Sequence, residues 1–581
     1  MATFSIPDDK GKITQLNDGD NRGNVFASFS MDFNEAGKVK VSAPTKVFFD
    51  KVTDADFSDV VMGFVKYDTN KLLALGGGEV RYFTADSYSS YTTSDGVTPT
   101  LASADDGAYY NGLILVSDGT TIRSSTNGVS WANWWETTLA QSALSTSSVD
   151  EPRLMKVGFN GNLYISDAGN KIYYYTGSGA PVLTGNGTLN ISLTNEIFTC
   201  METSSTRMWI GTKNIGGEAS VIEWDLSLGS ETPNRVHKIG AEAVRAIVIY
   251  EDTPVAILSD GRMRIFNGIK FVDWEIMNIR VPFGKKLAYN FIHRNGWDII
   301  DGLPHIAITG QIDSTGSKYE RASEQEWAMP SGVYCLDPEK GLYHRFSFGS
   351  GDYGPSGTDI DNYGEVGATD VGALVAVDTK TGKFLVSYET MLTDSTYNPT
   401  LAYHINTDVQ GGKGWLATTF AMSFREAWKK LDFFHKPLET GCKIKVYSRA
   451  ENTAGKLLKG VWSSTTTFNA VTTGLDIQAG NLALVKMGNG AGQWIQVSAK
   501  AESSTVTTLT LNEANTKVTA GDYGTLEVFD FKYMGTIDDT QRDYHDLSVP
   551  QSESKRRRQF LFEFTQPAST NIEVDYLIAN T

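Results

Sequence analysis

Cysteine and histidine are scarce in this chain, and their pattern excludes several classes of protein. The three cysteines lie far apart at Cys200, Cys335 and Cys442, which excludes a disulfide framework and a cysteine-based zinc site and predicts buried, reduced thiols. No HExxH pair stands among the 7 histidines, and no P-loop, GxSxG elbow or dinucleotide-binding glycine motif occurs. We therefore expect no enzymatic activity, no cofactor and no metal, and we assign no catalytic, cofactor-binding or metal-ligating residue.

Long apolar runs are also missing. No stretch approaches the run of about 20 apolar residues that a spanning helix needs. The first residues, MATFSIPDDKGK, lack the basic-then-apolar order of a secretory signal. We expect a chain that is assembled in the cytoplasm and does not insert into a membrane.

Clustered basic charge is scarce as well. The chain has 51 Lys and Arg against 68 Asp and Glu, a formal net charge of −17, which argues against a protein that grips nucleic acid through its phosphates. DNA that slides past remains compatible with this charge, because an acidic lining repels phosphates. The one dense basic cluster, Lys555 to Arg558, is expected to be a solvated turn before the strand QFLFEF.

Turn residues and paired apolar runs, by contrast, are abundant. The 56 glycines and 11% aromatic residues, with frequent Ser, Thr, Asn and Asp, make an all-β composition. Apolar runs that flank a turn recur about every 40 to 50 residues, with longer steps late in the series, and this is the period of four-stranded propeller blades. The units begin at Thr69, Asn111, Asn160, Thr206, Asp252, His305 and Gly372. The series predicts a β-propeller of about seven blades.

The unit NGNLYISDAGNKIYYYTG, from Asn160, shows the expected hairpin. Two apolar runs surround the turn residues 167–170, and every second residue belongs to one face. The residues of that face are Leu163, Ile165, Ile172 and Tyr174. We expect each hairpin to bury only this face, against the next blade.

Aspartates in these turns are expected to form turns and not to catalyse. Ser-Asp-Gly recurs at 117–119 and 259–261, where Asp and Gly tolerate the positive φ of a short hairpin turn. The stretch RSSTNGVSW, 123–131, resembles the aspartate box S-x-D-x-G-x-T-W, but Thr126 stands where the aspartate belongs. We therefore expect a structural hairpin tip.

Two further groups of residues have a functional interpretation beside a structural one. The aromatic residues Trp131, Trp134, Trp135 and Tyr173 to Tyr175 are candidates for stacking on sugar rings, although packing between blades is the favoured interpretation.

The loop DIDNYGEVGATD is the second group. Asp359, Asp361, Gly364 and Asp370 occupy positions 1, 3, 6 and 12 of an EF-type loop, but Tyr363 stands at a ligand position. A solvated acidic loop is expected there in place of a calcium site.

The pattern changes near Phe420, and this change divides the chain. Alternating strands around WKKLDFF and KIKVYSR are matched only by strands after 528, and an independent strand-rich stretch lies between the two halves. We expect an N-terminal segment that contacts or closes the propeller, the propeller, a β-sandwich in two halves and an inserted β-barrel. Their ranges are 1–60, 61–415, 416–451 with 528–581, and 452–527, respectively.

The C-terminal strands carry a resemblance to a known family. The order WKKL, KVYSR, RRQFLFEF and IEVDYL resembles the C-terminal β-sandwich of tail and connector proteins of tailed bacteriophages, and the inserted GNLALVK, QWIQV and TTLTL are similar to small barrels of virion proteins. The whole layout resembles the nozzle or hub protein that closes a short phage tail.

The resemblance implies a structural virion protein of the tail. It would form a cyclic ring, expected to be a hexamer, around the DNA exit channel, and it would dock adjacent tail adaptor and fibre or spike proteins. Genomic DNA would pass without sequence-specific contacts. The alternative is a propeller that binds or cleaves glycans on the host surface.

Overall fold

The computed structural model shows an all-β protein, as the composition predicts. The only helical elements among its described residues are a π-helical turn, η1 (Trp134–Thr138), and a 3-10 turn, η3 (Glu275–Met277). None of the described helices is long and apolar enough to cross a membrane. The structure describes residues 2–4, 25–29, 31–32, 38–41, 45–50, 59–67, 71–76, 79–84, 92–93, 104, 106–146, 151–167, 171–183, 196–227, 233–279, 281, 286–313, 326–327, 329, 331–339, 341–348, 368–378, 383–393, 396–404, 412–418, 421–422, 430–450, 455–487, 492–515, 518–548, 557–567, 570 and 572–580.

Seven four-stranded antiparallel sheets occur in the described part of the chain and follow one another along the sequence. Their strands, in order within each sheet, are β6 (Val61–Tyr67), β7 (Lys71–Gly76), β8 (Glu79–Thr84), β9 (Thr92–Thr93); β10 (Gly107–Tyr110), β11 (Leu113–Asp118), β12 (Thr121–Ser125), β13 (Ala132–Asn133); β14 (Met155–Val157), β15 (Leu163–Asp167), β16 (Lys171–Tyr175), β17 (Val182–Leu183); β18 (Glu196–Thr203), β19 (Met208–Asn214), β20 (Ser220–Trp224), β21 (Arg235–Lys238); β22 (Val244–Tyr250), β23 (Thr253–Leu258), β24 (Met263–Phe266), β25 (Phe271–Asp273); β27 (Trp297–Ile300), β28 (Leu303–Ile308), β31 (Gly332–Asp337), β32 (Gly341–Ser347); and β33 (Ala368–Asp378), β34 (Lys383–Thr393), β35 (Thr396–His404), β5 (Lys46–Asp50).

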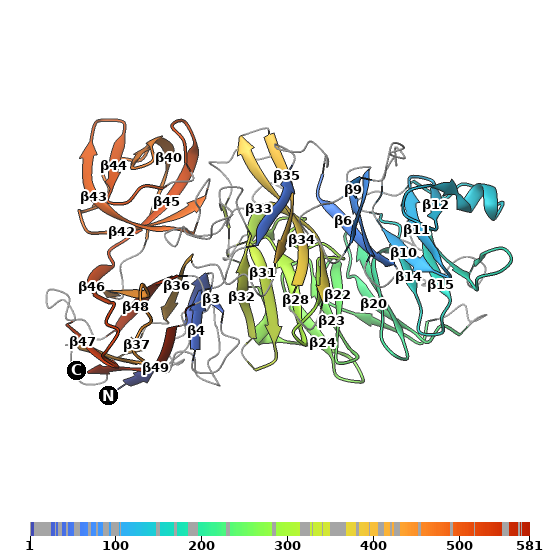
Figure 1. The fold of residues 1–581 in the computed structure, drawn as a ribbon, viewed down its shortest axis with the longest axis horizontal. Coiled ribbons are helices and arrows are strands. Elements are labelled where there is room, and N and C mark those ends of the chain that lie inside the picture. The colour runs from blue at the N-terminus through green and yellow to red at the C-terminus, as the bar shows by residue number, and fades with distance from the viewer. Residues whose placement is uncertain are drawn as a thin grey trace.

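These sheets stand side by side in Figure 1, and their contacts close them into a propeller-like ring. The first strand of each sheet contacts the first or second strand of the next, and β33 of the last sheet contacts β6 of the first. The last sheet is completed by β5, which comes from the N-terminal part of the chain and pairs with β35. A small sheet of β26 (Lys286–Leu287), β29 (Gln311–Asp313) and β30 (Glu326–Trp327) is added beside the ring.

The prediction that each hairpin buries only one face is wrong. In β15 all five residues are buried, because the sheet packs against a neighbour on both sides. Leu163 and Ile165 join the cluster shared with the preceding sheet, whereas Tyr164 joins the cluster of the following sheet with Trp224. A sheet inside a ring has two covered faces, so its central strands are apolar almost throughout.

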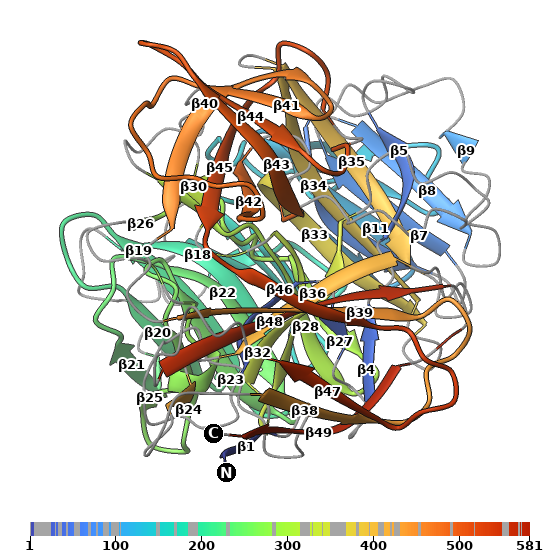
Figure 2. The same cartoon turned by 90° about the vertical axis from the view of Figure 1, so that its left-hand side faces the viewer.

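Two six-stranded sheets lie next to the ring (Figure 2). The first contains β3 (Met31–Asp32), β4 (Lys38–Val41), β49 (Ile572–Asn580), β38 (Lys430–His435) and β47 (Tyr544–Ser548), with β1 (Ala2–Phe4) on β49. The second contains β2 (Val25–Phe29), β36 (Gly412–Thr418), β48 (Arg557–Gln566), β39 (Lys443–Ala450) and β46 (Lys532–Ile537), with β37 (Ala421–Met422) on β48.

The segment between the two C-terminal halves forms a closed six-stranded barrel. Its strands, in barrel order, are β40 (Lys456–Ser464), β41 (Thr467–Ala470), β44 (Thr507–Leu511), β43 (Trp494–Glu502), β42 (Leu482–Met487) and β45 (Tyr523–Phe529). The barrel core continues into the second six-stranded sheet, because Trp415, Tyr447 and Leu561 belong to the same buried cluster as the barrel residues.

The N-terminal segment does not act as one unit. Strand β5 closes the ring, but β1, β2 and β4 pair with β49, β36 and β49, respectively, in the C-terminal sheets. The boundary expected after 415 falls inside β36, whose Leu416 is buried between the two six-stranded sheets. We refer to these two sheets and the barrel together as the C-terminal assembly.

Candidate functional site

The first strands of the ring converge on a cavity of about 470 Å³. Its walls come from β6, β10, β14, β18, β27 and β33 and from the segment that leads into β27. The strand registers place several of its residues at one depth. Lys66, Tyr109, Lys156 and Glu202 each pair with the second residue of the strand that follows, so they occupy equivalent positions in their sheets.

Charged residues of both signs line this cavity. Among the described residues the lining contains the bases Lys66, Lys156 and Arg294 and the acids Asp106, Glu202 and Asp298. The formal charges of this set cancel. The cavity therefore differs from the strongly acidic chain as a whole, whose net charge is −17.

Two ion pairs connect different sheets across the cavity wall. Lys156 Nζ lies 2.5 Å from Glu202 Oε2, which links β14 to β18. Lys66 Nζ lies 3.4 Å from Asp298 Oδ2, which links β6 to β27. Burial lowers the pKa of Lys156, but the charge of Glu202 and its hydrogen bond outweigh this effect and raise that pKa above its ordinary value.

Asp106 is a carboxylate of the cavity with a strongly raised pKa. Burial raises the pKa of Asp106 to about 6, against the opposing charge of Arg294 and backbone hydrogen bonds. The Gly107 amide donates to Oδ1 at 2.8 Å, and the Met155 amide donates to Oδ2 at 3.2 Å. Asp106 thus joins β10 to β14 through the backbone of both strands.

The cavity wall also contains a cysteine that is not activated. Burial raises the pKa of the Cys200 thiol to about 12, so the thiolate that a nucleophile requires is not populated at neutral pH. Cys335 and Cys442 are buried as well, and none of the three cysteines forms a disulfide, which confirms the prediction of buried thiols. The described residues contain no group of three or more His, Cys, Asp or Glu that could hold a metal ion.

Three aromatic side chains complete the lining, one each from β6, β10 and β27. They are Phe64, Tyr109 and Trp297. Tyr109 is 43% exposed, whereas Phe64 and Trp297 are partly buried. The cavity therefore offers apolar ring surface next to paired charges.

Sequence reasoning did not find this site. The signal lay in the strands before each predicted hairpin, where a charged residue interrupts an apolar run, as in FVKY at Lys66, LMKV at Lys156 and CMET at Glu202. When its strand is considered alone, such a residue is predicted to be exposed to solvent. Only the ring brings these positions together.

The aromatic residues proposed for sugar stacking are used in packing between sheets. Trp134 and Trp135 are 3% and 1% exposed. The ring of Trp134 meets that of Tyr175 edge-on at 5.2 Å, and Trp135 meets Tyr173 at 5.1 Å. Trp131 is partly buried against the cluster that contains Val65 and Val116.

The hairpin tip at Thr126 is organised by its neighbours. Ser125 Oγ accepts from the Gly128 amide at 2.9 Å, and Asn127 Oδ1 accepts from the amides of Val129 and Ser130. Gly128 has φ +80°, and a Cβ there would lie 2.8 Å from the Tyr67 hydroxyl. Thr126 itself is exposed, so Asn127 provides the carbonyl oxygen that organises the turn.

The Ser-Asp-Gly aspartates lie at turns, as predicted. Asp118 pairs with Thr121 across a short turn that contains Gly119 at φ +58°, and its carboxylate forms an ion pair with Arg123. Asp260 precedes Gly261, at φ +83°, and accepts from Arg262. Both carboxylates serve the local hairpin.

The candidate calcium loop lies mostly outside the described residues. Asp359, Asp361, Tyr363 and Gly364 belong to the part that is not described. Asp370 lies in β33, where it is buried and accepts from Asn290 Nδ2 at 2.9 Å.

The basic cluster 555–558 is only partly described. Lys555 and Arg556 precede the described range, and Arg557 begins β48. Arg558 is fully buried and donates to Ser448 Oγ at 3.0 Å. The prediction of a solvated turn is therefore wrong for Arg558, because the strand begins earlier and carries this side chain into the protein.

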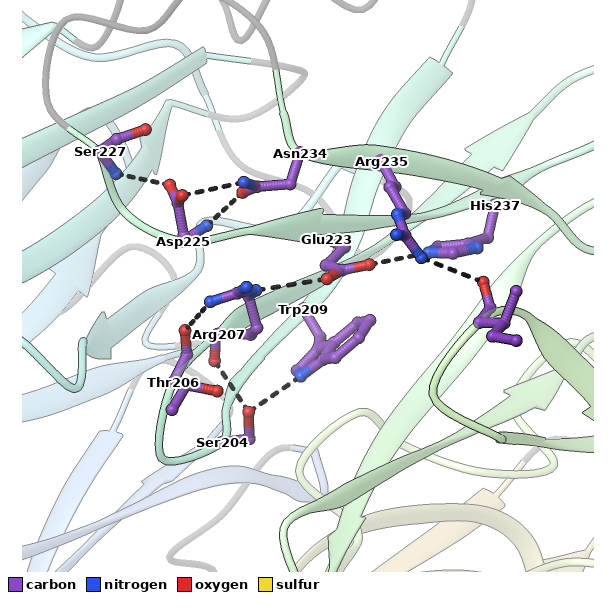
Figure 3. A network of polar contacts seen from close by, with 11 residues as sticks. Ser204, Thr206, Arg207, Trp209, Glu223, Asp225, Ser227, Asn234, Arg235 and His237 are labelled. Carbon is purple, nitrogen blue, oxygen red and sulfur yellow. Dashed lines mark hydrogen bonds and ion pairs between the residues drawn. The ribbon is translucent and has the colours of Figure 1, made fainter.

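A second polar cluster lies on the outer strands of one ring sheet (Figure 3). The carboxylate of Glu223 bridges Arg207 Nε and His237 Nε2, each at 3.2 Å. Arg235 donates to the Ile269 carbonyl at 3.4 Å and so connects this sheet to the next one. The cluster holds two sheets together at the outside of the ring.

Known proteins resemble this chain only in fold, and only with low TM-scores. No family model and no curated protein matches the chain. Solved structures that resemble it include virginiamycin B lyase from Staphylococcus aureus, at 10% identity over 59% of this chain and 95% of that chain with a TM-score of 0.36. BamB from Moraxella catarrhalis is similar at 12% identity over 59% and 83%, with a TM-score of 0.32. Scores this low carry no argument, so the description of the fold depends on the sheets of this chain.

Proposed function

We propose that the ring is a seven-bladed β-propeller and that the two six-stranded sheets form a β-sandwich. Contact between β33 and β6, together with completion of the last sheet by β5, supports the closed propeller. A shared buried cluster supports the sandwich, because Leu431 and Phe433 of one sheet pack with Phe562 and Phe564 of the other.

The function that this architecture supports best is that of a structural protein of a bacteriophage tail. In this role six copies of the chain form a cyclic hexamer around the DNA exit channel, and each copy docks neighbouring tail proteins. Apart from the sequence resemblance, one structural observation supports the proposal. Cys335 and Tyr343 of the propeller-like ring lie in the same buried cluster as both six-stranded sheets, and the barrel shares a second cluster with one of those sheets.

A subunit whose parts are joined by shared cores suits a role in assembly. Relative motion of the parts would separate buried apolar surface, so the subunit presents fixed surfaces to its neighbours. Head-to-tail contacts between such rigid subunits close into rings, and several weak contacts then act together.

Native mass spectrometry of the purified full-length chain tests the proposed hexamer directly. Six copies in one complex at low micromolar concentration are the expected result, and a monomer at every concentration would contradict the proposal. A glycan array and a hydrolysis assay on the same preparation test the alternative role in host recognition. Cleavage of a saccharide would establish that role in place of the structural role.

The passage of DNA has its own test. A net charge of −17 and a buried Arg558 leave little basic surface for phosphate contacts. We expect duplex DNA to bind weakly or not at all in a gel-shift assay at about 150 mM salt, where the Debye length is about 8 Å. Sub-micromolar binding that is lost when Lys555 and Arg556 are changed to Gln would show that the cluster grips phosphates.

A further inference from the structure

We propose that the cavity at the centre of the ring is a binding site for a small, uncharged saccharide. Its volume of about 470 Å³ is that of a small-molecule site, since such pockets measure about 300–1,000 Å³. The inference goes beyond the structural role, because a subunit can assemble whether or not this cavity is occupied.

The charge of the cavity determines the charge of its ligand. Its three bases and three acids among the described residues cancel. Lys156 and Glu202 neutralise each other at 2.5 Å, and Lys66 and Asp298 do so at 3.4 Å. A charged ligand would lose its hydration without gaining a counter-ion, whereas an uncharged polar ligand has no such cost.

The same pairs provide hydrogen bonds. An ammonium group has three donors and a carboxylate has about four acceptor positions, so one ion pair leaves donors and acceptors for further partners. Lys66, Lys156 and Glu202 lie at one depth of the ring, as the strand registers show. Donors of the two lysines and an acceptor of Glu202 at one level match the adjacent hydroxyl groups of a sugar ring, each of which donates and accepts.

Aromatic rings provide the apolar part of the site. Tyr109 occupies the register position equivalent to Lys66 and Lys156, and it is 43% exposed although it lines the cavity. Phe64 and Trp297 lie on strands β6 and β27, which the Lys66–Asp298 pair connects. Exposed aromatic surface beside a polar set is suited to the C–H face of a pyranose.

Access to the site is through the side where Lys66 and Tyr109 are exposed. The Lys66 side chain is 54% exposed and that of Asp298 is 29% exposed, whereas that of Glu202 is 12% exposed. Because Lys66, Tyr109, Lys156 and Glu202 lie at one depth, a ligand that enters from this side would meet Tyr109 and both ion pairs at the same level.

Titration calorimetry of the full-length chain at pH 7 tests the site. The probes are D-galactose, N-acetyl-D-glucosamine and maltose, with glucosamine and glucuronate as charged counterparts. We expect saturable binding of at least one uncharged probe, with both charged counterparts at least about tenfold weaker, a difference of about 1.4 kcal/mol. Absence of saturable binding by all three uncharged probes, or tighter binding of a charged one, would overturn the proposal.

Variants locate the binding. Tyr109→Ala is expected to weaken binding at least about tenfold. Tyr523→Ala is the matched control, because Tyr523 is 47% exposed but lies on the barrel, and it should bind as the unchanged chain does. Equal affinity of both variants would place the saccharide elsewhere and refute the assignment.

A charge variant tests the argument from neutrality. Lys66→Gln leaves Asp298 without its ion-pair partner and gives the cavity a formal charge of −1, so preference should shift towards glucosamine. An unchanged preference would contradict the charge argument. Because Lys66 is more than half exposed, its replacement should leave the fold intact, and circular dichroism of the variant checks this.

Discussion

The ring and the C-terminal assembly are both built from antiparallel strands, but they draw those strands from the sequence in opposite ways. Five ring sheets in the described chain consist of strands that follow each other in sequence, and a sixth is interrupted by β29 and β30. Only the last recruits a distant strand, β5. In the C-terminal assembly, β36 pairs with β2 and β48, so that residues near 28, 416 and 562 form one sheet. Local pairing makes the ring a series of similar units, whereas the C-terminal sheets depend on distant parts of the chain meeting.

The largest expected loss of stability comes from a substitution in the core of the C-terminal assembly. Phe562 is fully buried between the two six-stranded sheets, and Phe562→Ala should lower the free energy of unfolding of that region by about 3–5 kcal/mol. Urea denaturation followed by tryptophan fluorescence measures the change. Tyr533→Ala is the control, since Tyr533 is 48% exposed and should alter stability by no more than about 0.5 kcal/mol.

The next effect concerns closure of the ring. Gly372 in β33 lies against β6, and a Cβ at this position would stand 2.1 Å from the Val61 carbonyl oxygen. Gly372→Ala should therefore force the first and last sheets apart and cost about 3 kcal/mol. Gly302→Ala is the comparison, because Gly302 has φ +81° but nothing within 4 Å of its Cβ position, and it should cost only about 1 kcal/mol. Equal losses in thermal unfolding would mean that the closure is not tightly packed.

The sequence predicted the ring better than the C-terminal assembly, because most ring strands pair with strands nearby in the sequence. The runs from Asn111 and Asn160 are β11 with β12 and β15 with β16, because a hairpin carries its turn and both of its strands in one short stretch. The pairing of β1 with β49 joins Ala2 to Ala579 and leaves no such local pattern. The cavity was missed because its residues come from strands more than 200 positions apart, such as Lys66 and Asp298.

A smaller effect is expected where the barrel meets the second six-stranded sheet. Glu513 of the barrel segment lies 3.0 Å from Lys445 Nζ and 3.5 Å from Lys413 Nζ. Burial raises the pKa of Glu513, but Lys413 and Lys445 outweigh it, so the pKa in the folded chain lies below its ordinary value. A lowered acid pKa stabilises the folded chain above the unfolded pKa, and this contribution is lost as pH falls through the folded pKa.

Glu513→Gln should therefore cost about 0.5 kcal/mol at pH 7, a value typical of solvent-exposed ion pairs, and less at pH 3. Denaturation of the variant, of Lys445→Gln and of the double variant at both pH values measures the coupling. A coupling energy that is the same at pH 7 and pH 3 would show that the pair does not titrate as described.

The smallest effect is expected at the hairpin tip of the ring. Thr126 is exposed, and Asn127 already accepts the amides of the turn, so Thr126→Asp should change stability by no more than about 0.5 kcal/mol. The variant should also hydrolyse no glycoside, because the residue serves only the turn. Hydrolysis by either the unchanged or the substituted chain would refute the structural interpretation of this hairpin.

Hydrogen–deuterium exchange of Phe562→Ala and Gly372→Ala, measured side by side, tests the central difference between the two regions most directly. The account predicts that Phe562→Ala increases exchange in β2, β36, β39, β48 and β49, with β11, β15 and β23 of the ring as protected as in the unchanged chain. Gly372→Ala should increase exchange in β6 and β33 and leave β39 and β48 protected. Increased exchange in β11, β15 and β23 in Phe562→Ala, or in β39 and β48 in Gly372→Ala, would contradict the account, because it would show that loss of packing in one region spreads through the other beyond the core that they share.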